Sequence, residues 1–126
     1  MSKESKKMLY PIALEYLKDT SRYPGFVWTR EFDAELRAAT TNTQKACICA
    51  REGFEEMAGF NYLPRARHTE GLGQEAYDQI YLVAVERHAQ KAEALAKKST
   101  GFSQESFLGE AERMREKAEV YRRMMK

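Results

Sequence analysis

The feature that most constrains the fold of this chain is a helical repeat of apolar residues in its C-terminal half. From Gln74 onward, large side chains recur every three or four residues, which places them on one face of an α-helix. That face carries Tyr77, Ile80, Tyr81, Ala84, Val85, His88, Ala92 and Leu95. Glu75 near the start and Lys97 and Lys98 at the end match the helix macrodipole. We therefore predict one long helix over residues 74–98.

A second long helix is predicted after Gly101. Ser103 can cap it, with Phe102 and Phe107 placed as a hydrophobic staple around the cap. Its apolar residues follow a 4-3 heptad spacing. These residues are Phe107, Ala111, Met114, Ala118, Tyr121 and Met125. Residues 74–126 thus form a helical hairpin, and we predict that the first five of these residues form the interface of a homodimer. The alternative is that they pack only against residues 74–98.

The N-terminal part is also predicted to be mainly helical, with a flexible basic tail over residues 1–9 and a helix that begins at Pro11. Thr29 can cap the next helix, which runs to about Ala39. After a very short connection, Thr41 and Gln44 form a capping-box pattern that opens a third helix. Residues 10–73 are therefore interpreted as a helix-turn-helix-like unit that precedes the hairpin.

A helix-turn-helix unit inserts the first residues of its second helix into the major groove of DNA. The residues at that place are Thr41, Asn42, Thr43, Gln44 and Lys45. Asparagine and glutamine can pair with adenine, threonine can touch the thymine methyl group, and lysine can reach guanine or phosphate. We predict that these five residues contact double-stranded DNA.

Residues 60–73 are the least regular segment, because Pro64, Gly71 and Gly73 favour a loop or a hairpin. The segment contains Arg65, Arg67 and His68.

With the run Phe26, Val27 and Trp28, this layout over residues 10–85 resembles that of winged-helix transcriptional regulators. The resemblance implies DNA binding, with the basic residues of a short β-wing on the DNA backbone or in the minor groove. The second strand of such a wing would be residues 79–85, whose side chains favour β structure. The helical stripe continues through them, however, and we predict a helix there.

The net charge of the chain and its distribution limit which functional classes are expected. The net charge is +2, with 11 basic and 10 acidic residues in 1–72 and 10 and 9 in 73–126. Strong nucleic-acid binders usually carry a marked basic excess. Our first interpretation is a dimeric, sequence-specific DNA-binding regulator. The alternative is a small helical protein-interaction module without DNA binding: an adaptor, inhibitor or assembly factor of the kind that mobile elements such as phages encode.

Other functional classes lack sequence support. The chain has no glycine-rich phosphate loop, no nucleophile elbow and no metal-binding His-Glu helix motif, so we do not expect an enzyme or a cofactor. Cys47 and Cys49 are one residue apart, and His68 and His88 lack ligand spacing, so we expect buried cysteines and no metal site. No apolar segment is long enough to cross a membrane, and no signal sequence is present, which predicts a cytoplasmic protein.

Overall fold

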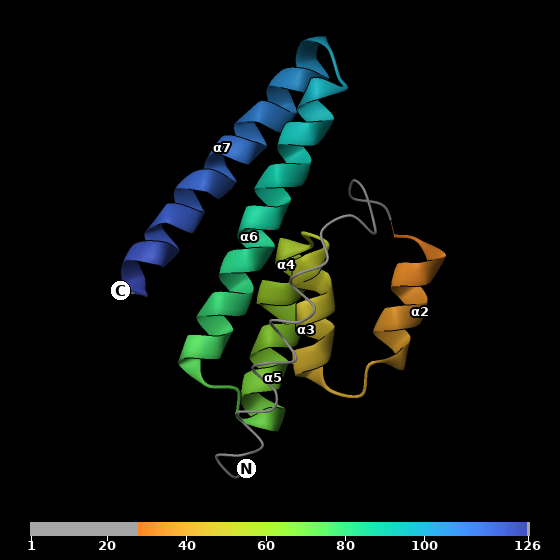
Figure 1. Ribbon diagram of the computed structural model, residues 1–126, viewed down its shortest axis with the longest axis vertical. Coiled ribbons are helices and arrows are strands. Elements are labelled where there is room, and N and C mark those ends of the chain that lie inside the picture. The colour runs from red at the N-terminus through yellow and green to blue at the C-terminus, as the bar shows by residue number, and fades with distance from the viewer. Residues whose placement is uncertain (1–27, 126) are drawn as a thin grey trace.

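The computed structural model describes residues 28–125, which are helical almost throughout (Figure 1). The helices are α2 (Arg30–Ala38), α3 (Asn42–Arg51), α4 (Glu55–Met57), the π-helical turn η1 (Ala58–Tyr62), α5 (Leu63–Glu70), α6 (Gln74–Lys97) and α7 (Gly101–Met124). Residues 28–125 contain no strand, which confirms a mainly α fold. The predicted tail over 1–9, the helix from Pro11, and Phe26 and Val27 lie outside the described residues.

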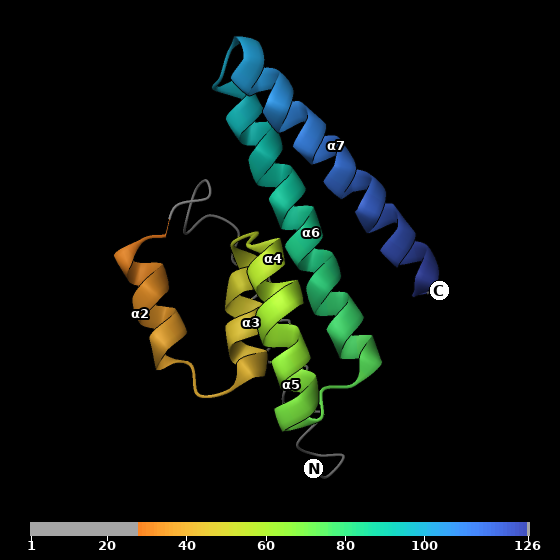
Figure 2. The same cartoon turned by 180° about the vertical axis from the view of Figure 1, so that it is seen from behind.

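The elements form a central group with a long hairpin on one side (Figures 1 and 2). Helices α3, α4 and α5 lie together, α2 packs on α3, and α6 packs between this group and α7. The predicted hairpin is confirmed, and its turn projects well beyond the ends of α3–α5. Among the described residues, no helix combines the length and apolar character that a membrane span requires.

The two predicted N-terminal caps are present. The Thr29 hydroxyl accepts a hydrogen bond from the Phe32 backbone N–H at 3.0 Å and begins α2. Thr41 and Gln44 form a reciprocal capping box at the start of α3. Helices α2 and α3 run in opposite directions beside each other, joined by residues 39–41 (Figures 1 and 2).

The prediction of a loop or hairpin over residues 60–73 was wrong, because η1 and α5 occupy residues 58–70. Pro64 lies in the first turn of α5, directly after the π-helical turn η1. Gly71 ends α5 with φ +64°, a left-handed conformation that glycine adopts without strain. Residues 79–85 belong to α6, as predicted, so neither segment forms a β-wing.

The predicted start of the last helix was also wrong. Helix α7 begins at Gly101 after Thr100, which puts Ser103 inside its first turn. Gly101 takes φ +60°, and this glycine conformation turns the chain from α6 into α7 three residues earlier than a Ser103 cap requires. Phe102 is exposed and therefore does not form the predicted staple.

The heptad residues of α7 pack inside the hairpin. Ala111 and Ala118 are buried, Phe107 is partly buried, and Met114 and Tyr121 pack against the core. The Tyr121 ring meets the Tyr81 ring of α6 edge-on, with 5.0 Å between centroids. This is the intrachain arrangement that we gave as the alternative. A dimer through these residues stays a prediction, and it would have to displace their contacts with α6.

Candidate nucleic-acid interface

The first residues of α3, which we predicted to enter the major groove of DNA, form hydrogen bonds within the protein. The Gln44 Oε1 atom accepts hydrogen bonds from the backbone N–H groups of Thr40, at 2.9 Å, and Thr41, at 3.3 Å. Thr43 is only 1% exposed. Thr43 is buried and the Gln44 side chain is engaged in the capping box, so this geometry does not support the prediction that Thr43 and Gln44 read bases.

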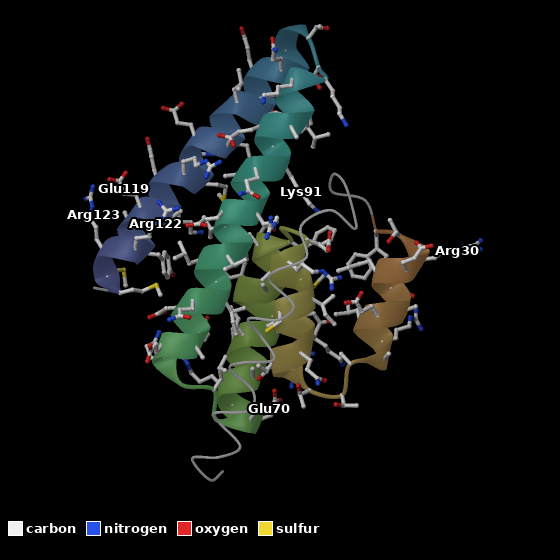
Figure 3. The ribbon with its side chains drawn as sticks, viewed as in Figure 1. Arg30, Glu70, Lys91, Glu119, Arg122 and Arg123 are labelled. Carbon is white, nitrogen blue, oxygen red and sulfur yellow. The ribbon has the colours of Figure 1, made fainter. Side chains whose placement is uncertain are left out.

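Glu70, at the end of α5, occupies the position in front of α3 (Figure 3). Its carboxylate accepts bonds from the backbone N–H groups of Thr43, at 2.7 Å, and Asn42, at 3.2 Å. The Thr43 hydroxyl and the Asn42 side-chain amide donate to it at 2.8 and 3.2 Å, and the Thr69 hydroxyl also contacts it. Burial raises the pKa of Glu70, but these hydrogen bonds outweigh burial and hold it below its ordinary value. The positive end of α3 is therefore already neutralised by a carboxylate.

Next to this cap, two cations from different helices approach one tyrosine. The Lys45 Nζ atom of α3 lies 5.9 Å from the centroid of the Tyr62 ring. Arg65 of α5 lies close enough for its charge to oppose the rise that burial causes in the pKa of Tyr62. The Thr69 hydroxyl donates to the Arg65 carbonyl at 2.8 Å and accepts from the Asn42 amide at 3.0 Å.

We call this surface the α3–α5 face. It comprises Asn42, Lys45, Tyr62, Arg65, His68 and Thr69, where His68 follows Arg65 by three residues on the same side of α5. Arg67 points elsewhere. Its guanidinium lies 4.2 Å above the Tyr77 ring and donates to Gln74 Oε1 at 2.7 Å, both at the start of α6. The structure thus brings Lys45 and Arg65 together and separates Arg67 from them.

The α3–α5 face carries two cations, Lys45 and Arg65, and the ion pairs of the described residues show how they compare with the other cations. Seven of the fifteen described lysines and arginines form ion pairs with described carboxylates; these are Arg37, Arg51, Lys91, Arg115, Lys117, Arg122 and Arg123. Neither Lys45 nor Arg65 has a carboxylate oxygen within 4.0 Å of its side-chain nitrogens among the described residues. Glu70 is the one acidic residue of α3 and α5, and it is bound at the start of α3.

Other described cations for which the same holds are spread over the molecule. Arg30 lies on α2 and points outward (Figure 3). Lys97 and Lys98 lie at the end of α6, and Arg113 lies on α7. Acidic and basic residues are evenly distributed along the sequence, but their pairing in the folded protein is uneven. Acidic residues pair with cations along the hairpin, whereas Lys45 and Arg65 on the α3–α5 face have no carboxylate partner among the described residues. No signal in the sequence marks Tyr62 as their common neighbour, because the contact joins residues from different helices.

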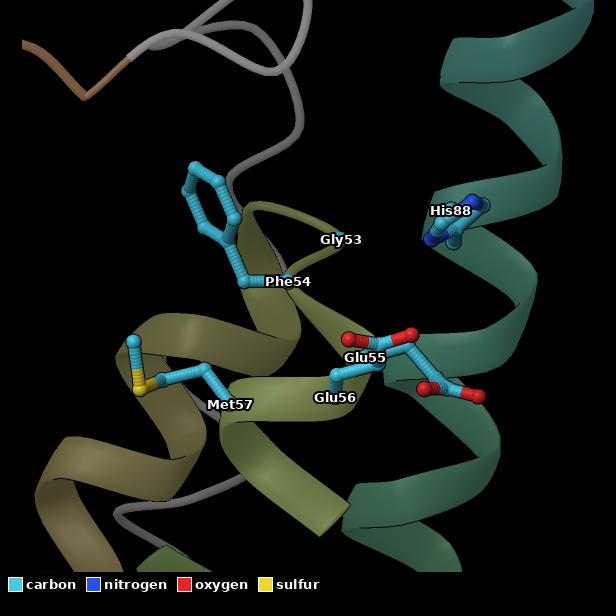
Figure 4. Close-up of a pocket in the computed structure, with 6 residues that line it drawn as sticks. All are labelled: Gly53, Phe54, Glu55, Glu56, Met57 and His88. Atoms are coloured by element: carbon cyan, nitrogen blue, oxygen red, sulfur yellow. The ribbon is translucent and has the colours of Figure 1, made fainter. Parts of the chain in front are cut away.

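A separate pocket of about 260 Å³ lies between the α3–α4 junction and α6 (Figure 4). It is lined by Gly53, Phe54, Glu55, Glu56, Met57 and His88. His88 is paired with Glu110 of α7 through its Nε2 atom, at 2.6 Å. Over residues 28–125, no cluster of three or more His, Cys, Asp or Glu side chains is arranged to hold a metal ion.

Cys47 and Cys49 are fully buried in the core around α3. Burial raises the pKa of both thiols, that of Cys49 to about 12, so both remain protonated at neutral pH. We therefore assign them a packing role.

Comparisons of this chain with protein-family models, with curated proteins and with solved structures found no match. The resemblance to winged-helix regulators thus stays a prediction.

Proposed function

We propose that this protein binds nucleic acid through the α3–α5 face, with Lys45 and Arg65 as its main phosphate contacts. The observation that carries the proposal is that both cations lie near Tyr62 without a carboxylate partner among the described residues, whereas seven of the other thirteen described cations have one. A phosphate backbone that meets lysine and arginine releases bound counterions, which drives binding at low salt.

Phosphate contacts position a nucleic acid but carry no sequence information. Binding through phosphate contacts alone is therefore a more general function than that of the sequence-specific, dimeric regulator that we predicted. Base reading by α3 would need free side chains at its N-terminus, where Glu70 and the capping box now engage Asn42, Thr43 and Gln44. Regulation of transcription would require base contacts elsewhere on the chain.

The test is fluorescence anisotropy with a labelled oligonucleotide over a series of salt concentrations. Lys45→Gln and Arg65→Gln should each weaken binding and reduce the slope of log K against log salt by about 0.7–0.9 for each lost phosphate contact. Lys98→Gln is the matched control, since it removes the same charge from an exposed lysine at the far end of α6. An equal loss in all three variants would show that net charge alone matters. Absence of binding at low salt would refute the proposal.

A helical protein-interaction module is the second candidate, and one observation favours it. Phe102 is 85% exposed at the end of the projecting hairpin. Aromatic side chains often dominate binding energy at protein interfaces. A defined partner protein that binds the wild-type chain and the Lys45→Gln variant, but not Phe102→Ser, would support this function.

A further inference from the structure

We propose that the side of α7 that faces away from α6 binds a second copy of this chain, with the two α7 helices antiparallel. This inference goes beyond nucleic-acid binding and does not depend on it. The surface is distinct from the heptad residues that pack inside the hairpin, so a dimer formed through it leaves every hairpin contact in place.

The outer side of α7 carries a helical repeat of its own. Residues spaced by three or four positions share one side of a helix. On this side they are Phe102, Ser106, Gly109, Arg113, Glu116, Val120 and Met124, which we call the outer stripe. All of them are exposed except Gly109, which is partly buried. Phe102, Val120 and Met124 are 85%, 51% and 66% exposed, so apolar side chains lie at both ends of the stripe and charged ones in its middle.

The outer stripe is open along the whole of α7. Among the described elements α7 packs only against α6, and it lies at the margin of the molecule (Figures 1 and 2). A helix of 24 residues is about 36 Å long. The open side is therefore long enough to pack against a second helix of the same length.

Gly109, near the middle of the stripe, is not required by the packing of this chain. Glycine is among the least favourable residues in the interior of a helix. Gly109 is not among the glycines with positive φ, and an added Cβ atom would come within 4 Å only of the Arg113 side chain, at 3.6 Å from Nη1. Neither backbone conformation nor a close neighbour in the described chain therefore calls for glycine. Its missing side chain leaves a gap on the helix surface, and the side chains at a contact set how closely two helices approach.

The outer stripe is complementary to itself when its direction is reversed. With a two-fold axis close to Arg113, Val120 of one copy comes opposite Gly109 and Ser106 of the other. Phe102 of one copy then comes opposite Met124 of the other. A two-fold axis makes each of these contacts twice. The larger apolar side chains thus meet either each other or the gap that Gly109 leaves.

The charges of α7 favour the same antiparallel arrangement. Glu105 and Arg123 lie on one flank of the stripe, and in this register Glu105 of one copy comes opposite Arg123 of the other. Arg123 pairs with Glu119 of its own helix, but a guanidinium has further donors. At the centre, Arg113 comes opposite Glu116 of the second copy, and neither has an ion pair within the described residues. A parallel pair would instead place Arg113 beside Arg113.

The test is sedimentation velocity of the full chain, without nucleic acid, at concentrations up to millimolar. The wild type should show a monomer–dimer equilibrium. Val120→Gln and Gly109→Gln should each raise the dissociation constant about tenfold or more, as expected for residues at the centre of an interface. Gly109→Gln should not destabilise the monomer, because glutamine favours a helix more than glycine does. Circular dichroism checks that each variant is folded.

Leu108→Gln is the matched control. Leu108 lies on the same helix and is 51% exposed, like Val120, but it lies about 120° away around the helix axis. Its replacement should leave the dissociation constant unchanged. A wild type that remains monomeric at millimolar concentration would overturn the proposal. So would an equal loss of dimer in Leu108→Gln, or a dimer that Val120→Gln and Gly109→Gln leave intact.

Disulfide cross-linking tests the orientation of the two helices. Arg113→Cys places two thiols near the proposed axis, so mild oxidation should join the copies. Phe102→Cys places them at opposite ends of the helix pair, too far apart for a disulfide. The native Cys47 and Cys49 are buried and should not compete. Efficient cross-linking of Phe102→Cys would contradict the antiparallel arrangement. None of these outcomes bears on the proposed function, which the anisotropy assay tests separately.

Discussion

The carboxylate of Glu70 holds α5 to the start of α3, so replacing it by glutamine should measurably destabilise the protein. Glu70→Gln keeps the size of the side chain but removes its charge and turns one acceptor oxygen into a donor. The two backbone N–H groups of Asn42 and Thr43 that now point at the carboxylate, at 3.2 and 2.7 Å, would then face a weaker acceptor.

The size of the effect follows from two contributions. A negative charge at a helix N-terminus contributes about 0.3–2 kcal/mol. A hydrogen bond to a charged group contributes about 1.5–3 kcal/mol, against about 0.5–1.5 kcal/mol for a neutral one. Because Glu70 is partly exposed to water, which weakens its electrostatic interactions, we expect the free energy of unfolding to fall by about 1–2 kcal/mol at pH 7.

The effect should depend on pH in a defined direction. Hydrogen bonds hold the pKa of Glu70 in the folded state below its ordinary value of 4.5. The stabilisation is therefore fully present above that value and is lost as the pH falls through the folded-state pKa. The difference between the wild type and Glu70→Gln should stay constant near neutrality and shrink in acid.

Urea denaturation followed by circular dichroism, at several pH values, measures this difference directly. Glu116→Gln is the control, because Glu116 is an exposed glutamate of α7 with no ion pair among the described residues. Equal destabilisation by both substitutions, or a Glu70→Gln effect that does not diminish in acid, would refute the reasoning.

Two further predictions follow from close contacts and caps. Gly59→Ala should lower the free energy of unfolding by about 1–3 kcal/mol, because the new methyl group would overlap the buried Tyr81 ring; unchanged urea denaturation would contradict this packing. Gln44→Ala should lower stability by about 0.5–2 kcal/mol through loss of its cap bonds, without changing nucleic-acid affinity. A folded Gln44→Ala variant with weakened binding in the anisotropy assay would instead restore the predicted base-reading role.

Features that depend on near neighbours in the chain could be predicted from the sequence. The hydroxyl groups of Thr29 and Thr41 accept bonds from residues three positions ahead, so each cap is contained in four consecutive residues. The apolar stripe from Tyr77 onward repeats over many turns, which allowed α6 to be recognised despite its β-favouring residues. Local geometry is sufficient in each case, because the interacting groups are brought together by the helix itself.

Residues 58–70 show where local signals fail. Pro64 and Gly71 are helix breakers in general, but here they occupy the first turn and the position just after the end of α5, where they are compatible with the helix. The heptad residues of α7 identified an apolar surface but not its partner. Burial of Ala118 against the same chain is a property of the folded hairpin, since the 4-3 spacing serves an intrachain or an interchain contact equally well.

The candidate site depended most on tertiary structure. The sequence places basic and polar residues near Thr41 and near Arg65, but only the fold brings Glu70 to Asn42, 28 residues away, and so closes the end of α3 that was expected to meet DNA. Only the fold places Lys45 and Arg65 around Tyr62 while acidic residues elsewhere pair with other cations. Helix periodicity sets which side chains share a face of one helix, whereas packing between helices decides which charges meet across them.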